Sequence, residues 1–396
     1  MFKSIPGVST VFSKAGIPID LTVVRENIED TYGGIEHMQT NDVAQCRRLI
    51  TRPGSEQIHR YAFEVALKKK GKRVTCAHKA NIMKLTDGLF LETFYKVAKE
   101  YPNVKADDVI IDDMAMKLVS RPDLFDVVVL PNLQGDIISD LCAGLVGGLG
   151  LAPSANIGHN ISIFEAVHGT APDIAGKDIA NPTALLLSGC AMLRHLNLDN
   201  QARLIEQGLL RTLDLGFRTR DLATSQDKLV STSQFTEEII RNMPNVEEGT
   251  DEPKEIKPIK SVPKTTANIM MVTGNRKREK EEVVGFDIFV DSNLGPSDLA
   301  EFLIKSANPQ SKGLELVMLS NRGTQVWPTG SVFTECVNHY RARFQSKNSV
   351  PTKDLLLLAS EIQDVAASTG ADVRICSLEM LLVIDGKPGF SLAQGQ

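Results

Sequence analysis

The chain has 396 residues and a formal net charge of −5 at pH 7, and 42% of its residues are hydrophobic and 23% charged. This length is too great for one small hydrophobic core, so two or three globular domains are expected. The slightly acidic balance gives no reason to expect a nucleic-acid or membrane-surface partner, and no apolar run approaches the length that spans a bilayer.

Strands that alternate with helices predict an α/β architecture for the first part of the chain. Short runs rich in β-branched residues predict four strands, at 20–25, 73–78, 109–114 and 126–132. Apolar residues at helical spacing predict helices between them, at 55–70 and 80–101. Residues 183–215 are predicted to be almost entirely helical, and a further helix is expected at 235–243.

The composition then changes over residues 244–268. This segment carries four prolines and many charges but few large apolar side chains, which is typical of a solvated linker. Residues 269–396 beyond it are predicted to form a small, separate α+β domain. The pattern there predicts strands at 285–292 and 313–321 and helices at 297–307, 331–347 and 353–368.

Residues 132–144, NLQGDIISDLCAG, place two aspartates four residues apart directly behind a predicted strand. A helix that begins near Asp136 would put Asp136 and Asp140 one turn apart on the same side. Two interpretations stay open on spacing alone. Asp136 caps the helix and favours its positive end, or both carboxylates join Asp112, at the end of the strand at 109–114, as oxygen ligands of the kind that Mg²⁺ or Mn²⁺ prefers.

Two long stretches resemble the β-decarboxylating dehydrogenases, which comprise isocitrate, isopropylmalate, homoisocitrate and tartrate dehydrogenases. They are NLQGDIISDLCAGLVGGLGLAPSANIG and FEAVHGTAPDIAGKDIANPTALLLS. Within this family, VVRENIEDTYGGIEH and HKANIMKLTDGLF are similar to the isocitrate dehydrogenase form. LSNRGTQVWP, VNHYRARF and DGKPGFSLAQGQ are similar to the extra C-terminal domain of extended bacterial isocitrate dehydrogenases.

The resemblance implies an isocitrate/isopropylmalate dehydrogenase-like α/β fold plus a small C-terminal α+β domain. Residues 1–145 would be the small, dimer-forming domain, and 146–243 the remainder of the large cofactor-binding domain. Chains of this family begin well upstream of Met1. The part before it, on the order of a hundred residues, would carry the Ser/Asn substrate loop and two further substrate arginines.

The family's active site is shared between two subunits of a homodimer. The resemblance implies that Asp136 and Asp140 of one subunit and Asp112 of the other bind Mg²⁺ or Mn²⁺. Arg25 would bind a substrate carboxylate, because a guanidinium fork suits that task. Tyr32 would be the general acid that protonates carbon after CO₂ leaves. Lys79 and Asn81 would reach into the neighbouring subunit's active site, Lys79 as the general base, directly or through Asp112 and a water, and Asn81 as a substrate contact.

The chain has no G-x-G-x-x-G segment, so the Rossmann fingerprint is absent. The resemblance instead assigns the dinucleotide to a loop that opens a helical region, whose N–H groups can meet adenosine and phosphate. The implied contacts are His168, Gly169, Thr170, Ala171, Asp173, Ile174 and Asn181. NADP-using members typically carry Lys-Tyr at 173–174, whereas a carboxylate about 4 Å from a 2′-phosphate costs about 1–4 kcal/mol. The sequence therefore predicts NAD.

The predicted function is metal-dependent oxidative decarboxylation of isocitrate to 2-oxoglutarate and CO₂ with reduction of NAD, a step of the tricarboxylic acid cycle. Homoisocitrate or tartrate dehydrogenase and a non-catalytic NAD-binding or regulatory subunit stay open as alternatives. The six cysteines stand singly, without C-x-x-C spacing, which indicates a reducing compartment. A cytoplasmic location is expected, or the mitochondrial matrix if a targeting segment precedes Met1.

Overall fold

A computed structural model describes residues 1–69, 73–158, 160–244, 280–330 and 334–391. The described residues form two compact units, each with its own core. The first unit takes residues 1–30, 50–80 and 89–244, and the second takes residues 31–49, 81–88 and those from 280 onward. The predicted linker lies outside the described residues except for its first position, and the predicted boundaries at 145 and 243 stay predictions.

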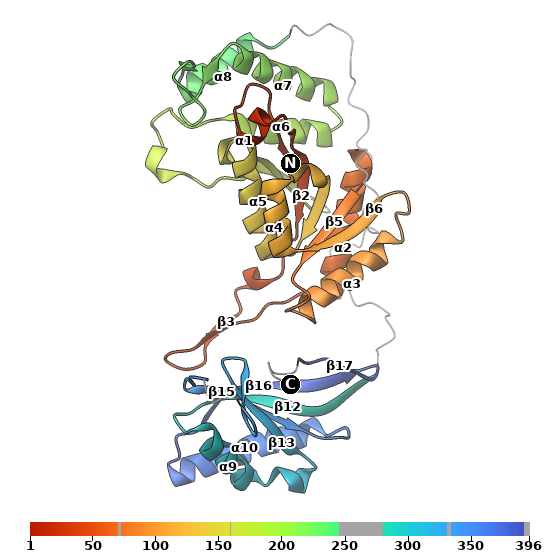
Figure 1. The fold of residues 1–396 in the computed structure, drawn as a ribbon, viewed down its shortest axis with the longest axis vertical. Coiled ribbons are helices and arrows are strands. Elements are labelled where there is room, and N and C mark those ends of the chain that lie inside the picture. The colour runs from red at the N-terminus through yellow and green to blue at the C-terminus, as the bar shows by residue number, and fades with distance from the viewer. Residues whose placement is uncertain (70–72, 159, 245–279, 331–333, 392–396) are drawn as a thin grey trace. The chain divides into compact units, whose positions relative to one another are not determined.

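A five-stranded sheet forms the centre of the first unit, with strand order β1-β2-β7-β5-β6 (Figure 1). Its strands are β1 (Phe2–Lys3), β2 (Asp20–Arg25), β5 (Arg73–His78), β6 (Lys105–Ile110) and β7 (Val127–Leu130). β1 is antiparallel to β2, and the other neighbours are parallel. Every residue of β7 is buried, as expected for a central strand covered on both faces. The strands predicted at 20–25 and 73–78 are confirmed.

Helices cover both faces of this sheet. On one face, α2 (Arg52–Lys68) and α3 (Thr86–Ala98) bury Phe63, Phe90 and Phe94 against the strands. On the other, α4 (Ile111–Ser120) and α5 (Asn132–Val146) bury an apolar layer centred on Met114, Leu118 and Ile138. Helices on both faces explain why the central strand β7, VVVL, is a continuous apolar run.

Two predicted element boundaries next to the sheet are wrong. The segment predicted as a strand at 109–114 leaves the sheet at Ile110, and α4 begins at Ile111. Met114 and Leu118, one helical turn apart, are both fully buried, and this spacing favours a helix. The helix expected from about Asp136 begins four residues earlier, at Asn132, directly after β7. Asp112 therefore lies in the first turn of α4, and Asp136 is the fifth residue of α5.

The remainder of the first unit is mostly helical, as predicted. It contains α6 (Thr183–His195), α7 (Asp199–Asp214) and α8 (Thr232–Arg241), with a hairpin of β8 (Pro153–Ile157) and β9 (Ser162–Ala166). A short parallel pair joins β10 (Phe217–Arg218) to β11 (Lys228–Leu229). A separate apolar cluster joins these helices to the start of the chain, and its buried members are Val8, Leu151, Leu209, Leu213, Phe235 and Ile239.

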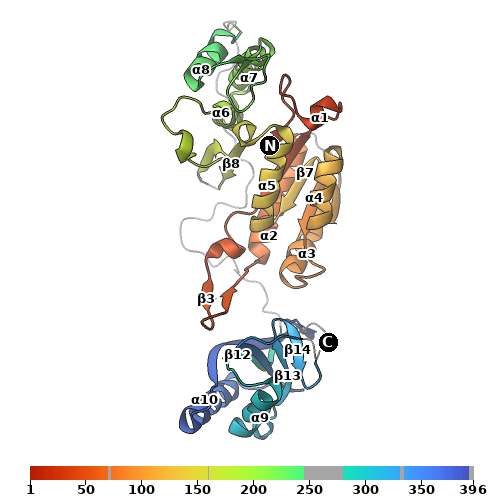
Figure 2. The same ribbon diagram turned by 60° about the vertical axis from the view of Figure 1, so that its left-hand side comes forward.

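The second unit contains a six-stranded sheet with order β14-β13-β15-β12-β16-β17. Its strands are β12 (Glu281–Asp291), β13 (Glu315–Asn321), β14 (Thr324–Trp327), β15 (His339–Gln345), β16 (Arg374–Ile384) and β17 (Lys387–Pro388). Two helices, α9 (Pro296–Ala307) and α10 (Thr352–Thr369), cover one face (Figure 2). The β-α-β-β-α-β order with antiparallel neighbours is the ferredoxin-like arrangement.

The helix predicted at 331–347 is wrong, because residues 339–345 form strand β15. Tyr340, Ala342 and Phe344 are buried in the core, whereas Arg341 and Arg343 alternate with them on the opposite face. This alternation of apolar and charged residues has the period of two that indicates a strand, and the helix prediction overlooked it.

A hairpin of β3 (Glu36–Met38) and β4 (Ala44–Cys46) belongs to the second unit and contacts its sheet. Arg374 donates to the Gln39 carbonyl over 3.2 Å, and Ser377 donates to the Gln39 side chain over 3.1 Å. Arg47 forms a 2.6 Å ion pair with Glu379. In the described part of the chain, no helix combines the length and the apolar character that crossing a membrane requires.

Candidate active site

Arg25 lies at the carboxyl end of β2, next to the point where the parallel strand β7 leads into α5. Its Nε donates to the Asn132 side chain over 3.0 Å, and its Nη1 donates to the Asp136 carboxylate, with which it forms an ion pair. The carboxyl ends of parallel strands are where α/β sheets bind ligands. The guanidinium and this carboxylate are therefore placed together at the edge where a site is expected.

Gly135 permits this close approach. A Cβ at this position would lie 2.6 Å from Cγ and 2.9 Å from Cβ of Arg25, so any larger residue would displace the arginine. A single glycine inside a helix indicates a packing reason only weakly, and nothing in the local sequence indicates which residue it faces.

Two buried acidic residues that follow β2, Glu26 and Asp30, accept hydrogen bonds from backbone N–H groups, and one of these groups lies at the start of α5. Glu26 accepts hydrogen bonds from the backbone N–H of Ile28 (2.8 Å) and of Glu29, and burial raises the pKa of Glu26. Asp30 is fully buried with a φ of 71°, and it accepts a 3.0 Å hydrogen bond from the Leu133 N–H. Asp30 therefore caps α5. The interpretation of Asp136 as the cap of this helix is wrong.

Lys79 and Asp112 meet at the ends of two other neighbouring strands. Lys79 follows β5, Asp112 lies in the first turn of α4 after β6, and Nζ and Oδ1 are 2.6 Å apart. The hydrogen bond from Lys79 holds the pKa of the Asp112 carboxyl below its ordinary value. One chain thus brings together Arg25 with Asp136, and Lys79 with Asp112.

The three predicted metal ligands present exposed carboxylates. The side chains of Asp136 and Asp112 are 46% and 68% exposed, and Asp140 is exposed one turn after Asp136 on α5. Among the described residues of one chain, no group of three His, Cys, Asp or Glu side chains could hold a metal ion. The donors suit Mg²⁺ or Mn²⁺, which take oxygen ligands and keep waters. A third ligand from a second subunit stays a prediction.

Tyr32 and Asn81 belong to the second unit, where both are exposed. Tyr32 lies in the 3₁₀ turn Thr31–Gly33, directly after the turn shaped by Glu26 and Asp30, and its side chain is 51% exposed. Their roles as general acid and substrate contact stay predictions.

The predicted dinucleotide loop follows β9. It contains one 3₁₀ turn, Pro172–Ile174, and α6 begins only at Thr183, so the helical region expected to open in this loop is wrong. Ala171 has a left-handed backbone, with φ 45°. His168, Gly169, Thr170, Ala171 and Asp173 are exposed, and Ile174 is half-buried. Exposure leaves these residues accessible to a ligand.

Two polar contacts in this region were not anticipated. Lys177 donates through Nζ to the Asp173 carbonyl over 2.7 Å, so the loop carries a cation beside the predicted selectivity residue. Asn181 donates to Asp221 over 2.9 Å and accepts from the Thr183 N–H over 3.0 Å. The Asn181 side chain thus already makes hydrogen bonds within the protein. A contact between Asn181 and adenine would have to come from its backbone.

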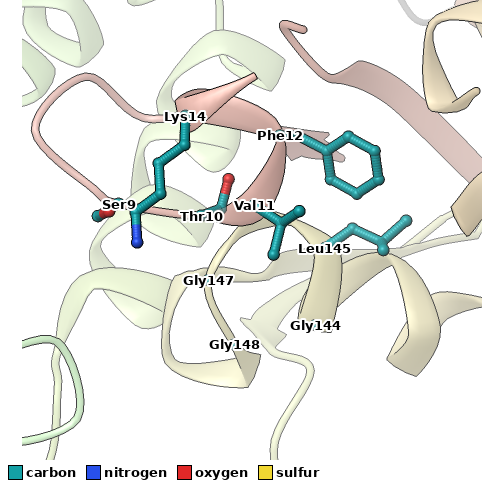
Figure 3. Close-up of a pocket in the computed structure, with 9 residues that line it drawn as sticks. All are labelled: Ser9, Thr10, Val11, Phe12, Lys14, Gly144, Leu145, Gly147 and Gly148. Carbon is teal, nitrogen blue, oxygen red and sulfur yellow. The ribbon is translucent and has the colours of Figure 1, made fainter. Parts of the chain in front are cut away.

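A cavity of about 440 Å³ lies elsewhere, between α1 (Val11–Lys14) and the carboxyl end of α5 (Figure 3). Its lining comes from residues 9–12, from Lys14 and from the glycine-rich end of α5, where Gly147 has a left-handed backbone. None of the predicted site residues lines it. The cavity is therefore separate from the candidate active site.

Comparison with known families accounts for most of the sequence. Residues 3–239 match the family model "Isocitrate/isopropylmalate dehydrogenase". The chain belongs to this family. Residues 281–396 match a second model, "Bacterial isocitrate dehydrogenase, C-terminal domain". Both parts of the resemblance seen in the sequence are thereby confirmed, as is the α/β fold with an added C-terminal domain.

Individual relatives carry isocitrate dehydrogenase names. The chain is 44% identical over 396 residues to isocitrate dehydrogenase (NADP) of Thermus thermophilus, and the match covers all of this chain and 76% of that protein. It is 51% identical over 242 residues to a mitochondrial isocitrate dehydrogenase (NAD) regulatory subunit of Dictyostelium discoideum, covering 61% and 66% of the two chains. The crystal structure of the TT0538 protein from Thermus thermophilus superposes with a TM-score of 0.87 at 42% identity, over all of this chain and 77% of that chain.

The prediction of an NAD-dependent enzyme is corrected by these relatives. The curated proteins that match nearly the whole chain are named for NADP. The prediction was based on Asp173 and Ile174, which stand where NADP-using members typically carry Lys-Tyr. It left out the Lys177 ammonium 2.7 Å from the carbonyl of the same residue, a charge of the sign that a 2′-phosphate requires.

Proposed function

We propose that this chain catalyses the oxidative decarboxylation of isocitrate to 2-oxoglutarate and CO₂, with a nicotinamide dinucleotide as oxidant and a divalent metal ion. The placement of Arg25 and Asp136 at the carboxyl ends of β2 and β7 carries this proposal. A guanidinium can bind a carboxylate of isocitrate, and the adjacent Asp136 carboxylate can bind a metal ion. Metal-dependent decarboxylation of isocitrate requires both.

Arg25 is the proposed substrate anchor. The Asp136 carboxylate holds the guanidinium in place without ligand, and the Asn132 side chain fixes its Nε at 3.0 Å. A carboxylate of isocitrate is a chemical equivalent of Asp136 as a partner for the fork. When the substrate pairs with Arg25, the Asp136 oxygens become available for a cation.

Asp136 and Asp140 of one subunit, with Asp112 of a second copy, are the proposed ligands of Mg²⁺ or Mn²⁺. The bound ion would supply Lewis-acid polarisation of the carbonyl oxygen, worth several kcal/mol. Because Asp112 is assigned to a second copy, this assignment makes a homodimer the proposed active form. Asn81 of the second copy would contribute a substrate contact.

The chain also supplies groups that take and return protons. Lys79 of the second copy is the proposed acceptor of the substrate hydroxyl proton. It would accept as the neutral amine, directly or through Asp112, whose Oδ1 lies 2.6 Å from Nζ in one chain. The exposed Tyr32 phenol would return a proton to the carbon that loses CO₂. These roles rest on the family resemblance and on the pairing of Lys79 with Asp112.

NADP is the proposed dinucleotide. Relatives matched along nearly the whole chain are named for it. Lys177 supports the same choice, because its ammonium lies in the exposed loop that carries His168 and Asp173. The ammonium would offset the Asp173 carboxylate and pair with a 2′-phosphate.

Steady-state kinetics with isocitrate, Mg²⁺ and either NADP⁺ or NAD⁺ test the proposal. Turnover that is faster with NADP⁺ is expected, and Asp136→Asn should lower kcat/KM by at least about 100-fold, because one ligand and the partner of Arg25 are lost together. Asp123→Asn is the control, since Asp123 is exposed and pairs with Arg121 after the carboxyl end of α4. No turnover of isocitrate with either dinucleotide would contradict the proposal.

A regulatory subunit is the second candidate function. The 51% identity to the Dictyostelium regulatory subunit favours it. If isothermal titration calorimetry detects isocitrate binding while no turnover is measured with either dinucleotide, this candidate replaces the enzyme.

A further inference from the structure

His78 forms a complete hydrogen-bond chain beneath the candidate active site. The ring is buried, with 4% of the residue exposed. Its Nδ1 accepts a 3.0 Å hydrogen bond from the Ala80 N–H, and its Nε2 lies 3.0 Å from Oδ2 of Asp108. Tyr95 donates its hydroxyl proton to the other oxygen of Asp108. The three residues come from three elements, namely β5, β6 and α3.

The backbone fixes the tautomer of this ring. Because Ala80 donates, Nδ1 must be unprotonated, so Nε2 carries the hydrogen and donates to Asp108. Burial alone would raise the pKa of Asp108, yet hydrogen bonds from Tyr95 and His78 keep that pKa below its ordinary value. Burial, together with the same carboxylate, raises the pKa of Tyr95, so the phenol stays a donor. Each hydrogen bond among Tyr95, Asp108, His78 and Ala80 therefore has a defined donor and a defined acceptor.

His78 contacts the backbone next to Lys79, whereas the two side chains belong to opposite faces of the sheet. Along β5, Cys76 packs into the core beneath α2 and α3, whereas Ala77 packs into the core beneath α4 and α5. By strand alternation, His78 faces the first layer and Lys79 the second, where Asp112 of α4 meets it. The imidazole reaches Ala80, the residue after Lys79, at the point where the chain leaves the first unit.

We infer that His78, oriented by Asp108 and Tyr95, is a positioning residue that sets the place of Lys79 by holding the Ala80 amide. This inference rests on the proposed function. β5 ends at His78, so the sheet ladder no longer guides the backbone at Lys79. The hydrogen bond to the imidazole replaces the missing ladder contact. The backbone is then fixed before Lys79 by β5 and after it by the Ala80 bond, and this backbone holds the Nζ of Lys79 2.6 Å from Asp112.

Two substitutions of His78 separate positioning from stability, because each keeps one of its two hydrogen bonds. His78→Asn places an acceptor oxygen near the position of Nδ1 and can retain the Ala80 bond. His78→Gln places a donor near the position of Nε2 and can retain the Asp108 bond. Since each loses one bond, both variants of the full chain should lower the melting temperature by similar amounts.

The expected kinetic result is a split between these variants. His78→Gln should lower kcat by about 10- to 100-fold, because a small displacement of a catalytic group has effects of that size. His78→Asn should keep kcat close to the unsubstituted chain, and KM for isocitrate should change little in either. A kcat that follows the melting temperature, equally low in both variants, would overturn the inference and leave His78 as a structural residue.

A second measurement does not depend on turnover. The full chain is treated with acetic anhydride, and the rate of acetylation at Lys79 is read by mass spectrometry. Loss of the position beside Asp112 should make Lys79 several-fold more reactive in His78→Gln than in His78→Asn, with the exposed Lys84 as an internal control. Equal Lys79 rates in both variants would overturn the positioning role. A split in reactivity without turnover by the unsubstituted chain would contradict the proposed function alone.

Discussion

Gly135 is the position where α5 comes closest to β2, and it faces the stem of Arg25. Gly135→Ala would put a methyl group 2.6 Å from Cγ of the arginine. The guanidinium must then leave Asp136 and Asn132. We expect kcat/KM for isocitrate to fall by at least about tenfold, because a misplaced binding group loses orientation.

Gly144→Ala is the matched control on the same helix. A Cβ at Gly144 meets nothing within 4 Å, and alanine favours a helix over glycine by about 1 kcal/mol. This variant should be as active as the unsubstituted chain and somewhat more stable. If Gly135→Ala and Gly144→Ala have the same kinetics, Arg25 does not bind the substrate from the position described.

His59 makes stability depend on pH. Its ring lies between Phe90 and Phe94, with ring centroids 4.3 and 5.3 Å away, and burial lowers its pKa from 6.5 to about 3. The folded state keeps the ring neutral, whereas the unfolded chain takes up a proton below pH 6.5. The free energy of unfolding should therefore fall as pH drops from about 6.5 toward 3, by up to about 1.4 kcal/mol per pH unit.

Urea denaturation at a series of pH values measures this dependence. His59→Gln should reduce the slope, since the amide does not titrate and can still donate to the Phe90 carbonyl that Nε2 contacts at 2.9 Å. His37→Gln is the control, because His37 is exposed on β3. An unchanged slope in His59→Gln would show that other groups carry the acid sensitivity.

At the scale of the element, the start of α5 depends on a residue far away in the sequence. Asp30 caps this helix through the Leu133 N–H and adopts a left-handed backbone, which Asp and Asn tolerate better than other side chains. Asp30→Ala loses the cap, about 0.5–2 kcal/mol, and adds left-handed strain of about 1–2 kcal/mol. Asp30→Asn keeps an acceptor and should cost less. Unfolding free energies of the two variants should differ by at least about 1 kcal/mol in this order.

The elements also show what the sequence can and cannot predict. Strand ends at Arg25 and His78 were predicted correctly, because apolar runs bounded by polar residues mark them. Helix α4 was missed, because 109–114 was predicted to be a strand. The start of α5 was misplaced by four residues, since its capping residue, Asp30, lies far away in the sequence. β15 was predicted as a helix although apolar and charged residues alternate over 340–344, which is the strand pattern, and the prediction missed this short signal.

The residues of the candidate site also divide into those that the sequence predicted and those that it did not. Asp136, Lys79 and Arg25 were found because family motifs carry them. Asp30, Gly135 and Lys177 were not, because their roles depend on distances between segments remote in sequence or on a loop conformation. No pattern in one sequence indicates that a glycine faces an arginine about 110 positions away.

At the scale of the whole molecule, the second unit contains a buried ion pair. Either charge, buried without the other, would destabilise the fold. Arg343 is 2% exposed and donates to both oxygens of Asp287, at 2.7 and 2.8 Å, while Arg341 lies near the same carboxylate. Within the described residues, Nη1 of Arg343 has no hydrogen-bond partner. Asp287 is therefore the only described carboxylate paired with this buried guanidinium.

Asp287→Asn tests how far the two units are coupled in stability. Removing one partner of a buried pair costs about 3–5 kcal/mol, whereas Glu301→Gln, which breaks an exposed pair with Lys305, should cost no more than about 1 kcal/mol. Hydrogen exchange read by mass spectrometry separates the units. Since each unit has its own core, β12 and β15 should lose protection in Asp287→Asn while β5 and β7 keep theirs. Equal loss of protection in both sheets would show instead that the units unfold as one cooperative body, and the ferredoxin-like unit would then stabilise the catalytic one.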